Sequence, residues 1–459
     1  MNVYGDGDYT LSKSIEYNAN EKAYFLAATT SYKSNGQNDG LLIKTDSTGK
    51  LIWEKYFGDK GSDEFSCIKK SADNNYFICG TYMNPTNVDY DIWVLKVDSN
   101  GNILWDKKME FANWDFARSL VATSDSGCII VGETNSIENQ SDVLFVKFDK
   151  DGVEEWQKVN FKYGEDKVRL IRPYIGNRYL ISYTLNESTD SAKTYVSIVN
   201  GAAQELRKFN FGTVQGDIVN GVDYQSNGNI IIAGALYNKN YNRLIKHLII
   251  TDSLFNVLII DSGSVAKGEA VYKDVKCLSN DNIIKVEETK QIGWNMYGTY
   301  DIRFEASSSM NDFITGPVYG LYYDDVPEEM YVVNDTIIAL TGSSENFGPA
   351  YNHAFLLTMK PIDGRTSLTK EVYIAGVKSV QFDRLLTCNF VHESLIVNLN
   401  LTNACFQIIN QLGQVFELPQ ERLSIQSVAI NCNSLSNGIY YLNINSNNQN
   451  QVIKFVVSK

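Results

Sequence analysis

Histidine, proline and paired cysteines are scarce in this chain. Only 3 His and 7 Pro occur in 459 residues, and the 7 Cys form no CxxC pair and no Cys/His spacing of the kind that binds zinc. The sequence also lacks GxSxG, HExxH, P-loop and GxGxxG motifs. These patterns assign no catalytic residue, so the sequence favours a non-enzymatic protein.

Positive charge is also in short supply. The formal net charge is −13 and the sequence pI is about 4.9. Because nucleic acids and anionic membranes bind basic surfaces, neither is expected as a partner. The best candidate for a membrane segment, HLIITDSLFNVLII (247–260), is interrupted by Asp252, so no transmembrane segment is expected. The opening stretch, MNVYGDGDYTLSK, has neither the basic nor the apolar region of a signal peptide.

What the chain does contain is a repeat. An apolar stretch recurs as YFLAAT, YFICGT, CIIVGE, YLISYT, IIIAGA, IIKVEE and IIALTG, starting at residues 24, 76, 128, 179, 230, 283 and 337. Successive copies are separated by 51 to 54 positions. Self-similarity at such a constant period is typical of repeat architectures.

Each repeat is expected to form four strands separated by turns. In the second unit the strands are predicted at 65–71, 76–82, 91–98 and 102–109, with Asn, Asp and Gly between them. No segment shows sustained helical periodicity, so helix should be nearly absent. Repeated four-stranded meanders indicate an all-β fold, namely a seven-bladed β-propeller of four-stranded antiparallel blades, with a solenoid as the alternative.

The turn between the third and fourth strands has the form D-x-x-G-x-x-x-W in the first three units. The Asp is expected to accept turn N–H groups, and the Gly to supply a positive φ. The Trp is expected to pack between blades rather than to form a binding platform. The predicted structural blade corners are Asp46, Gly49, Trp53, Asp98, Gly101, Trp105, Asp149, Gly152 and Trp156.

An acidic residue recurs thirteen positions before the apolar stretch in five units. These residues are Asp63, Asp115, Asp166, Asp217 and Asp324, with Glu269 one place out of register in the sixth unit. Since the first strand of a propeller blade lines the channel, they are candidates for an axial ring that holds a cation such as Ca²⁺ or a basic ligand. The alternative is that each Asp only caps the loop leading into its own blade.

Two segments interrupt the repeat with extra aromatic residues and glycine, GWNMYGTY (293–300) and VYGLYYDD (318–325). Loop aromatics on a propeller face can stack on sugars. The alternative is that these segments belong to irregular blades.

The repeats resemble those of surface and secreted propeller proteins of the Bacteroidetes, over roughly residues 9–375. The resemblance rests on D-x-x-x-x-K-x-D-S-x-G-x-x-x-W followed by SDEFSCIKKSADNNYFICGT. It implies a fold and a location more than an activity. KTDSTGKLIW also resembles the Trp-docking repeat of pyrroloquinoline-quinone dehydrogenases, which usually have eight blades and a vicinal Cys pair. This chain has seven units and no adjacent Cys, so that cofactor is not expected.

After residue 375 the period ends, and short alternating strands predict a small β-sandwich. This part resembles the C-terminal sorting domain of type IX secretion (Por) cargo. The matching segments are NQLGQVFEL (410–418), LSNGIYYLNI (435–444) and QVIKFVVSK (451–459), whereas CNFVHESLIVN (388–398) lacks the prolines expected in the opening motif. The motif residues are Gly413, Leu435, Gly438, Tyr440 and Lys454.

The second resemblance implies a route and partners. Such cargo crosses the inner membrane with a Sec signal, engages the type IX translocon, and loses its sorting domain to a sortase-like peptidase. The expected division is a propeller at 1–375, a linker at 376–384 and a sorting domain at 385–459. The expected location is secreted or on the outer-membrane surface, although the sequence as given shows no signal peptide.

Three functions fit these observations. The favoured one is a binding or adhesion module whose ligand is a glycan or a protein. The alternatives are an extracellular enzyme acting on glycans or peptides at the channel mouth, and a structural surface component.

Overall fold

The computed structural model describes most of residues 2–359 and the strands of residues 386–457. The described ranges are 2–4, 9–31, 33–86, 88–111, 114–137, 140–160, 164–263, 268–291, 300–307, 313–319, 324–335, 337–344, 353–359, 386–391, 394–399, 405–410, 415–416, 420–424, 427–432, 434–435, 438–446 and 449–457. Within them all regular structure is β-strand and no helix occurs. The expected 376–384 linker, Gly413 and nearly all of the 293–300 segment lie outside the described residues.

Four blades follow the predicted meander, each a separate four-stranded antiparallel sheet in chain order. The first two contain β2 (Thr10–Asn18), β3 (Ala23–Thr30), β4 (Asp39–Asp46) and β5 (Leu51–Phe57), then β6 (Glu64–Lys70), β7 (Tyr76–Asn84), β8 (Asp89–Val97) and β9 (Ile103–Met109). The next two contain β10 (Asp115–Ala122), β11 (Cys128–Ile137), β12 (Gln140–Phe148) and β13 (Glu154–Asn160), then β14 (Lys167–Tyr174), β15 (Arg178–Leu185), β16 (Lys193–Asn200) and β17 (Glu205–Gly212).

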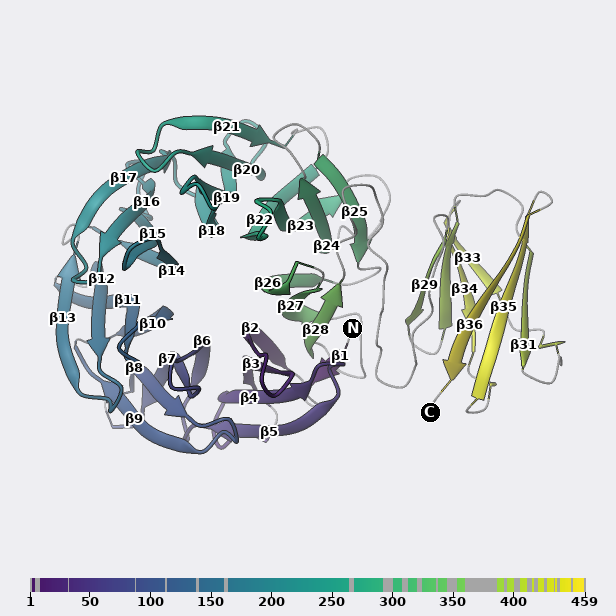
Figure 1. The fold of residues 1–459 in the computed structure, drawn as a ribbon, viewed down its shortest axis with the longest axis horizontal. Helices are drawn as coiled ribbons and strands as arrows, with labels where there is room; N and C mark the ends of the chain where they lie inside the picture. The colour runs from purple at the N-terminus through teal and green to yellow at the C-terminus, as the bar shows by residue number, and fades with distance from the viewer. Residues whose placement is uncertain are drawn as a thin grey trace.

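A fifth four-stranded sheet closes the ring by joining the two ends of the propeller sequence. It contains β26 (Asp325–Asn334), β27 (Ile337–Ser344), β28 (His353–Met359) and the N-terminal strand β1 (Asn2–Tyr4). β1 pairs antiparallel with β28 at the outer edge, next to the N-terminus marked in Figure 1. The segment expected to carry the last blade corner, 361–370, lies outside the described residues.

The prediction of seven separate blades is wrong, because the remaining strands form one sheet. The sheet contains β18 (Ile218–Tyr224), β19 (Ile230–Asn238), β20 (Arg243–Thr251), β21 (Val257–Ser262), β22 (Gly268–Cys277), β23 (Ile283–Gln291), β24 (Tyr300–Ser307) and β25 (Phe313–Tyr319). A single parallel bridge, Ile245 to Ala270, joins β20 to β22. The structure thus has five four-stranded blades and one eight-stranded sheet.

Ion pairs between side chains explain why β20 and β21 lie close to β23 and β24 here. Lys246 on β20 contacts Glu287 on β23 and Glu305 on β24 at 2.5 Å each. Lys285, which is fully buried, lies 3.2 Å from both Asp261 and Glu305. These ion pairs hold the two halves of the eight-stranded sheet together without the corner Trp of the first blades.

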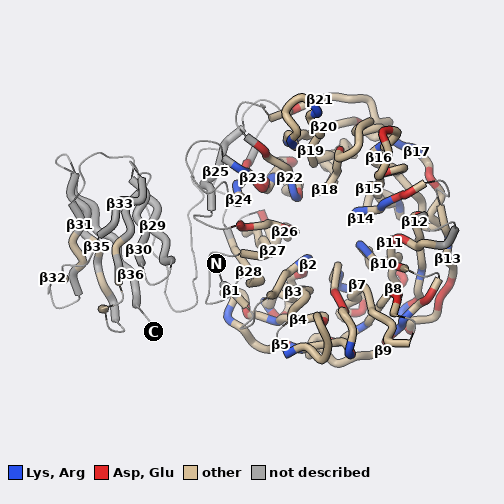
Figure 2. Tube along the Cα trace, turned by 180° about the vertical axis from the view of Figure 1, so that it is seen from behind, with Lys and Arg blue, Asp and Glu red and all other residues tan. Residues whose placement is uncertain are grey.

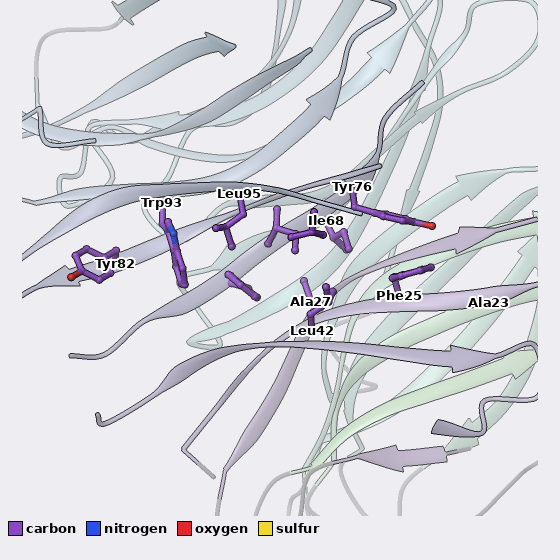
Figure 3. Close-up of a cluster of buried hydrophobic side chains, with 12 residues drawn as sticks. Ala23, Phe25, Ala27, Leu42, Ile68, Tyr76, Tyr82, Trp93 and Leu95 are labelled. Carbon is purple, nitrogen blue, oxygen red and sulfur yellow. The ribbon is translucent and has the colours of Figure 1, made fainter. Parts of the chain in front are cut away.

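The sheets are arranged radially around a common axis (Figure 1). The first strand of each meander lies innermost, and the fourth lies on the rim, as β5, β9, β13 and β17 show. Apolar side chains of neighbouring blades pack against each other. Figure 3 shows this between the first two blades, where Phe25 and Leu42 pack with Tyr76 and Trp93. Burial of such side chains is worth about 2 kcal/mol each, so interblade packing is the main source of stability.

Every inner strand carries a β-bulge in its pairing with the second strand of its meander. At four of these bulges the second strand has a glycine, at positions 80, 132, 234 and 342. A Cβ on Gly80 would lie 1.8 Å from the Glu64 carbonyl oxygen, and one on Gly132 would lie 2.2 Å from that of Phe116. Only glycine allows this approach, which explains the glycine in YFICGT and CIIVGE.

The C-terminal part contains two four-stranded antiparallel sheets. One contains β29 (Leu386–Val391), β30 (Ser394–Leu399), β34 (Ser427–Asn431) and β33 (Gln420–Ser424). The other contains β32 (Val415–Phe416), β31 (Cys405–Asn410), β35 (Gly438–Ser446) and β36 (Gln449–Val457). Leu435 and Tyr440 are buried, and the Tyr440 ring lies edge-on to Phe416. Two of the expected motif residues therefore lie in the core of this part.

Candidate functional site

The blade corners have a purely structural geometry in the first three blades. Asp46 Oδ1 accepts N–H bonds from Thr48 and Lys50, and Gly49 has a φ of 81°. The corners at Asp98 and Asp149 repeat this arrangement, with φ values of 72° at Gly101 and 78° at Gly152. The carboxylates are thus occupied by their own turns.

Each corner Trp reaches towards the next blade. A Cβ on Gly101 would lie 2.8 Å from the Trp53 ring, and one on Gly152 would lie 2.7 Å from that of Trp105. Trp105 Nε1 also donates to the Lys150 carbonyl at 3.1 Å. Trp156 packs at the edge of the core between the third and fourth blades. These contacts cover part of each Trp ring, and all three rings are half-buried.

The five aspartates predicted to form an axial ring lie in loops that cross from one blade to the next. We call Asp63, Asp115, Asp166, Asp217 and Asp324 the crossover aspartates. Backbone N–H groups bind them: Asp63 accepts from Asp59 and Met83, and Asp217 accepts from Val214 and Tyr237. Asp115, Asp166 and Asp324 accept from Phe111, Asn186 and Tyr300. Each crossover aspartate fixes a loop.

The crossover aspartates are not gathered into one site. Among the described residues, no three Asp, Glu, His or Cys side chains converge closely enough to hold a metal ion. Instead, three of them lie next to an acidic residue at the start of a third strand, because Asn38 bridges to Ser62, Tyr90 bridges to Trp114, and Asp166 N donates to the Ser141 carbonyl. The charges of Asp63 and Asp115 act on Asp39 and Asp91, and that of Asp142 acts on Asp166. Burial raises the pKa of Asp39, Asp63 and Asp91, and raises that of Asp166 to about 7.

A buried charged network on the inner strands was not predicted from the sequence. Its centre is Glu329 on β26, which accepts hydrogen bonds from Ser14 Oγ at 2.6 Å and Ile15 N at 3.1 Å. Lys69 and Arg172 lie 2.9 and 2.8 Å from its Oε1. Burial alone would raise the pKa of Glu329, but these two cations outweigh it and hold the pKa well below its usual range.

The network joins blades that are distant in the ring. β26 and β14 lie in different parts of the ring in Figure 1, and Figure 2 shows charged residues on the inner strands around the axis. The Arg172–Glu329 pair therefore spans the centre of the propeller. Lys69, Arg172 and Glu329 are thus paired with one another in a buried place.

Polar side chains also connect successive inner strands. Each accepts a hydrogen bond from a main-chain N–H of the next inner strand. The pairs are Ser14 with Ile68, Ser119 with Ile171, Asp223 with Cys277, Asp274 with Met330 and Glu329 with Ile15. Inner strands of neighbouring blades do not pair as strands of one sheet. These side chains therefore accept from main-chain N–H groups that would otherwise lack a partner across the blade boundary.

Glu16 makes the network sensitive to pH. Burial raises the pKa of Glu16 from 4.5 to about 7, and the charge of Glu329 adds to this although Lys69, 3.6 Å away, opposes it. The folded state thus binds a proton more tightly than the unfolded state, and stability falls as pH rises from about 4.5 through 7.

We expect the Glu16→Gln variant to avoid this loss of stability, which amounts to up to about 3 kcal/mol. Melting temperatures of both proteins from pH 5 to pH 8.5 test it: the curves should diverge between pH 5 and about 7 and keep a constant separation above that, and curves with the same separation at every pH would contradict the assignment.

An exposed aromatic cluster lies where the second and third blades meet. Trp114, in the loop before β10, is 53% exposed. Its ring centroid lies 6.0 Å from that of Tyr90 on β8 and 6.5 Å from that of Phe116 on β10. The Trp114 backbone bridges to Tyr90, and its carbonyl accepts from Asn135 N at 3.1 Å. We call Tyr90, Trp114 and Phe116 the aromatic platform.

Polar groups surround the aromatic platform. The Arg118 guanidinium lies 5.0 Å from the Phe116 ring centroid and contacts the buried Glu133 at 2.8 Å. Next to Tyr90, Asp91 is 3% exposed, and its Oδ1 has no hydrogen-bond partner among the described residues. The Trp114 ring stands at 81° to the rings of both Tyr90 and Phe116, so the exposed flat surface is that of Trp114 alone. An exposed aromatic ring bordered by hydrogen-bonding groups is an arrangement that can bind sugars or other amphipathic ligands.

The sequence contains a signal for the aromatic platform that is not part of the repeat. Trp114 directly precedes Asp115, where Ser62, Glu165 and Gly216 stand in other units. A Trp outside the repeat pattern is more informative than one within it. The loops predicted to carry sugar-binding aromatics, 293–300 and 318–325, are described only in part.

A comparison with protein families matches residues 389–458 to the secretion system C-terminal sorting domain. The chain carries a type IX sorting domain. The match covers the segment in which Leu435, Gly438, Tyr440 and Lys454 were recognised. The sorting domain implies export to the cell surface or medium and contact with the type IX machinery. No described helix is long and apolar enough to cross a membrane. No curated protein matches the sequence significantly.

Solved structures similar to the chain share its fold. A puromycin hydrolase has a TM-score of 0.51 at 8% identity, with 86% of this chain and 59% of that chain covered. The polysaccharide lyase Uly1 has a TM-score of 0.50 at 10% identity, with 78% and 91% covered. Drosophila Semaphorin 2a has a TM-score of 0.50 at 7% identity, with 96% and 95% covered. At these identities the likeness concerns the fold alone.

Proposed function

We propose that the protein is an exported binding module, with a propeller that binds carbohydrate on the aromatic platform and a sorting domain that brings it to the cell surface. The observation that carries the binding role is the exposure of Trp114 beside two further aromatic rings. Pyranose rings present flat C–H faces that pack on such surfaces, while their hydroxyls bond to the polar groups around them.

The charge around the aromatic platform favours an uncharged ligand. Asp89, Asp91, Asp115 and Glu110 lie near one another at this junction, and the chain as a whole carries −13. Anionic polysaccharides would be repelled, so neutral ones are the proposed class.

We further propose the following organisation. Residues 1–375 form the propeller, residues 376–384 the linker and residues 385–459 the sorting domain. The eight-stranded sheet is two four-stranded meanders, β18–β21 and β22–β25, which meet through one bridge and so complete a ring of seven repeats. We also propose that the repeats are of the Bacteroidetes surface-protein type. A sortase-like peptidase would remove the sorting domain after export.

Truncation of Trp114 tests the binding role. We expect Trp114→Ala to weaken polysaccharide binding about thirtyfold, since loss of a central Trp costs about 2 kcal/mol at binding sites. Native electrophoresis of the full chain in gels containing starch, xylan, laminarin or mannan measures this, with alginate as the anionic comparison.

Two controls sharpen the experiment. Trp114→Phe keeps a flat ring and should retain most of the binding. Leu104→Ala removes another exposed apolar side chain, 51% exposed on β9, and should change nothing. Equal retardation of the Trp114→Ala and wild-type proteins in every gel would contradict the proposal.

A further inference from the structure

The blade junctions contain pairs of buried carboxylates, and one pair, Asp91 with Asp115, lies beside the aromatic platform. Asp39, Asp91 and Asp142 occupy matching positions at the start of the third strand, paired in register with Thr30, Tyr82 and Thr134. Each faces the crossover aspartate that leads into the following blade. All six side chains are buried, with exposures of 3% or less.

The first pair shows the geometry most clearly. Asp39 Oδ1 and Asp63 Oδ2 both lie 2.7 Å from the point where a Cβ on Gly58 would be. Two oxygens from different blades therefore converge on one place, which only a glycine leaves open. An ion close to this point could contact both oxygens, because Ca²⁺–oxygen distances are about 2.3–2.6 Å.

Each pair has an oxygen that the protein itself does not satisfy. Asp39 Oδ1, Asp91 Oδ1 and Asp166 Oδ2 have no hydrogen-bond partner among the described residues. Their other oxygens do: Asp39 Oδ2 accepts from Asn35 N at 2.8 Å, and Asp166 Oδ1 from Asn186 N at 3.0 Å. An unsatisfied buried carboxylate oxygen is costly, so it needs a partner.

The backbone contacts favour an ion over a shared proton. Asp63 receives N–H groups from Asp59 at 2.7 Å and from Met83 at 2.9 Å. N–H donors stabilise the ionised form of a carboxyl group. Burial acts in the opposite sense and raises the pKa of both Asp39 and Asp63. Two carboxylates that ionise next to each other in a buried place therefore require a positive charge between them.

We propose that the three pairs, Asp39 with Asp63, Asp91 with Asp115 and Asp142 with Asp166, each bind a hard divalent cation such as Ca²⁺ between successive blades. The two carboxylates supply charge, and water and main-chain oxygens complete the coordination. The ions would tie the first four blades together, in place of the single axial ring predicted from the sequence.

The fourth junction provides a natural control. There the matching position in the third strand is Lys193, paired in register with Leu185, so no acid is present. The next residue, Thr194, donates from its hydroxyl to the Asp217 carbonyl at 2.8 Å. Asp217 still accepts N–H groups from Val214 and Tyr237. Asp217→Asn should therefore disturb a loop without removing a cation ligand.

Calcium binding by the full chain tests the proposal. Equilibrium dialysis against Ca²⁺ should show three ions per chain, and the melting temperature should rise by several degrees in about 5 mM CaCl2 compared with EDTA. Asp39→Asn and Asp166→Asn should each lose one ion and part of the rise. Asp217→Asn should melt lower in both buffers but keep three ions and the full rise.

Two results would overturn the proposal. One is a wild-type chain that binds no Ca²⁺. The other is a melting temperature that does not change with Ca²⁺ but rises when the pH is lowered. That result would mean that the two carboxyl groups of each pair share a proton instead of binding an ion. Dialysis of the wild-type protein decides between these outcomes even if a variant fails to fold.

Discussion

Glu329→Gln is expected to destabilise the propeller by about 3–5 kcal/mol, the cost of breaking a buried ion pair from one side. The substitution preserves the shape of the side chain but leaves Lys69 and Arg172 without their shared carboxylate. It also weakens the bonds from Ser14 Oγ and Ile15 N, which tie the last blade to the first. Urea unfolding of the full chain, followed by tryptophan fluorescence, measures the loss.

The neighbouring residue is a matched control. Glu328 pairs with Lys13 at 2.7 Å on the surface, where the two side chains are 23% and 41% exposed. A pair of this kind contributes at most about 1 kcal/mol. Glu328→Gln should therefore cost far less than Glu329→Gln, and equal costs would show that the network does not hold the ring together.

Removal of residues 385–459 is expected to abolish export to the cell surface while leaving the propeller folded. The sorting domain matches over residues 389–458, whereas the blades are formed by strands that end at Met359. The strand that closes the ring is β1, so closure does not depend on the C-terminal part.

The experiment uses a host with type IX machinery and a Sec signal placed before the chain. Antibody labelling of intact cells should detect the full chain and not the truncated one, which should be found in the periplasm. Conversely, residues 385–459 fused to a periplasmic reporter should bring the reporter to the surface. A reporter that stays in the periplasm would contradict the assignment of this part.

The repeat made the blade architecture predictable from the sequence. Four strands per unit and the glycine of YFICGT follow from local patterning, which each unit repeats. The fusion of β18–β25 was not predictable in this way, because Lys246, Glu287 and Glu305 come from different units and only meet in space. The place of β1 beside β28 is likewise a long-range pairing without a local signal.

The sites were less predictable than the fold, for a related reason. The position directly after the inner-strand bulge is equivalent in every unit, but the residue type there differs. It is Ser14 in the first unit, Cys67 in the second and Glu329 in the last. The charged network therefore leaves no recurring pattern in the sequence. The crossover aspartates recur and were predicted, but their partners Asp39 and Asp91 come earlier in the chain, in the third strand of the preceding blade, and only the structure pairs them.

The central claim is that the propeller is a carbohydrate-binding head carried to the surface by its sorting domain. The most direct test is the binding of a fluorescently labelled neutral polysaccharide, chosen from the gel panel, to intact cells displaying the full chain. Cells displaying the wild-type chain should bind it, and cells displaying Trp114→Ala at the same antibody signal should not. Equal polysaccharide binding by both populations would contradict the account.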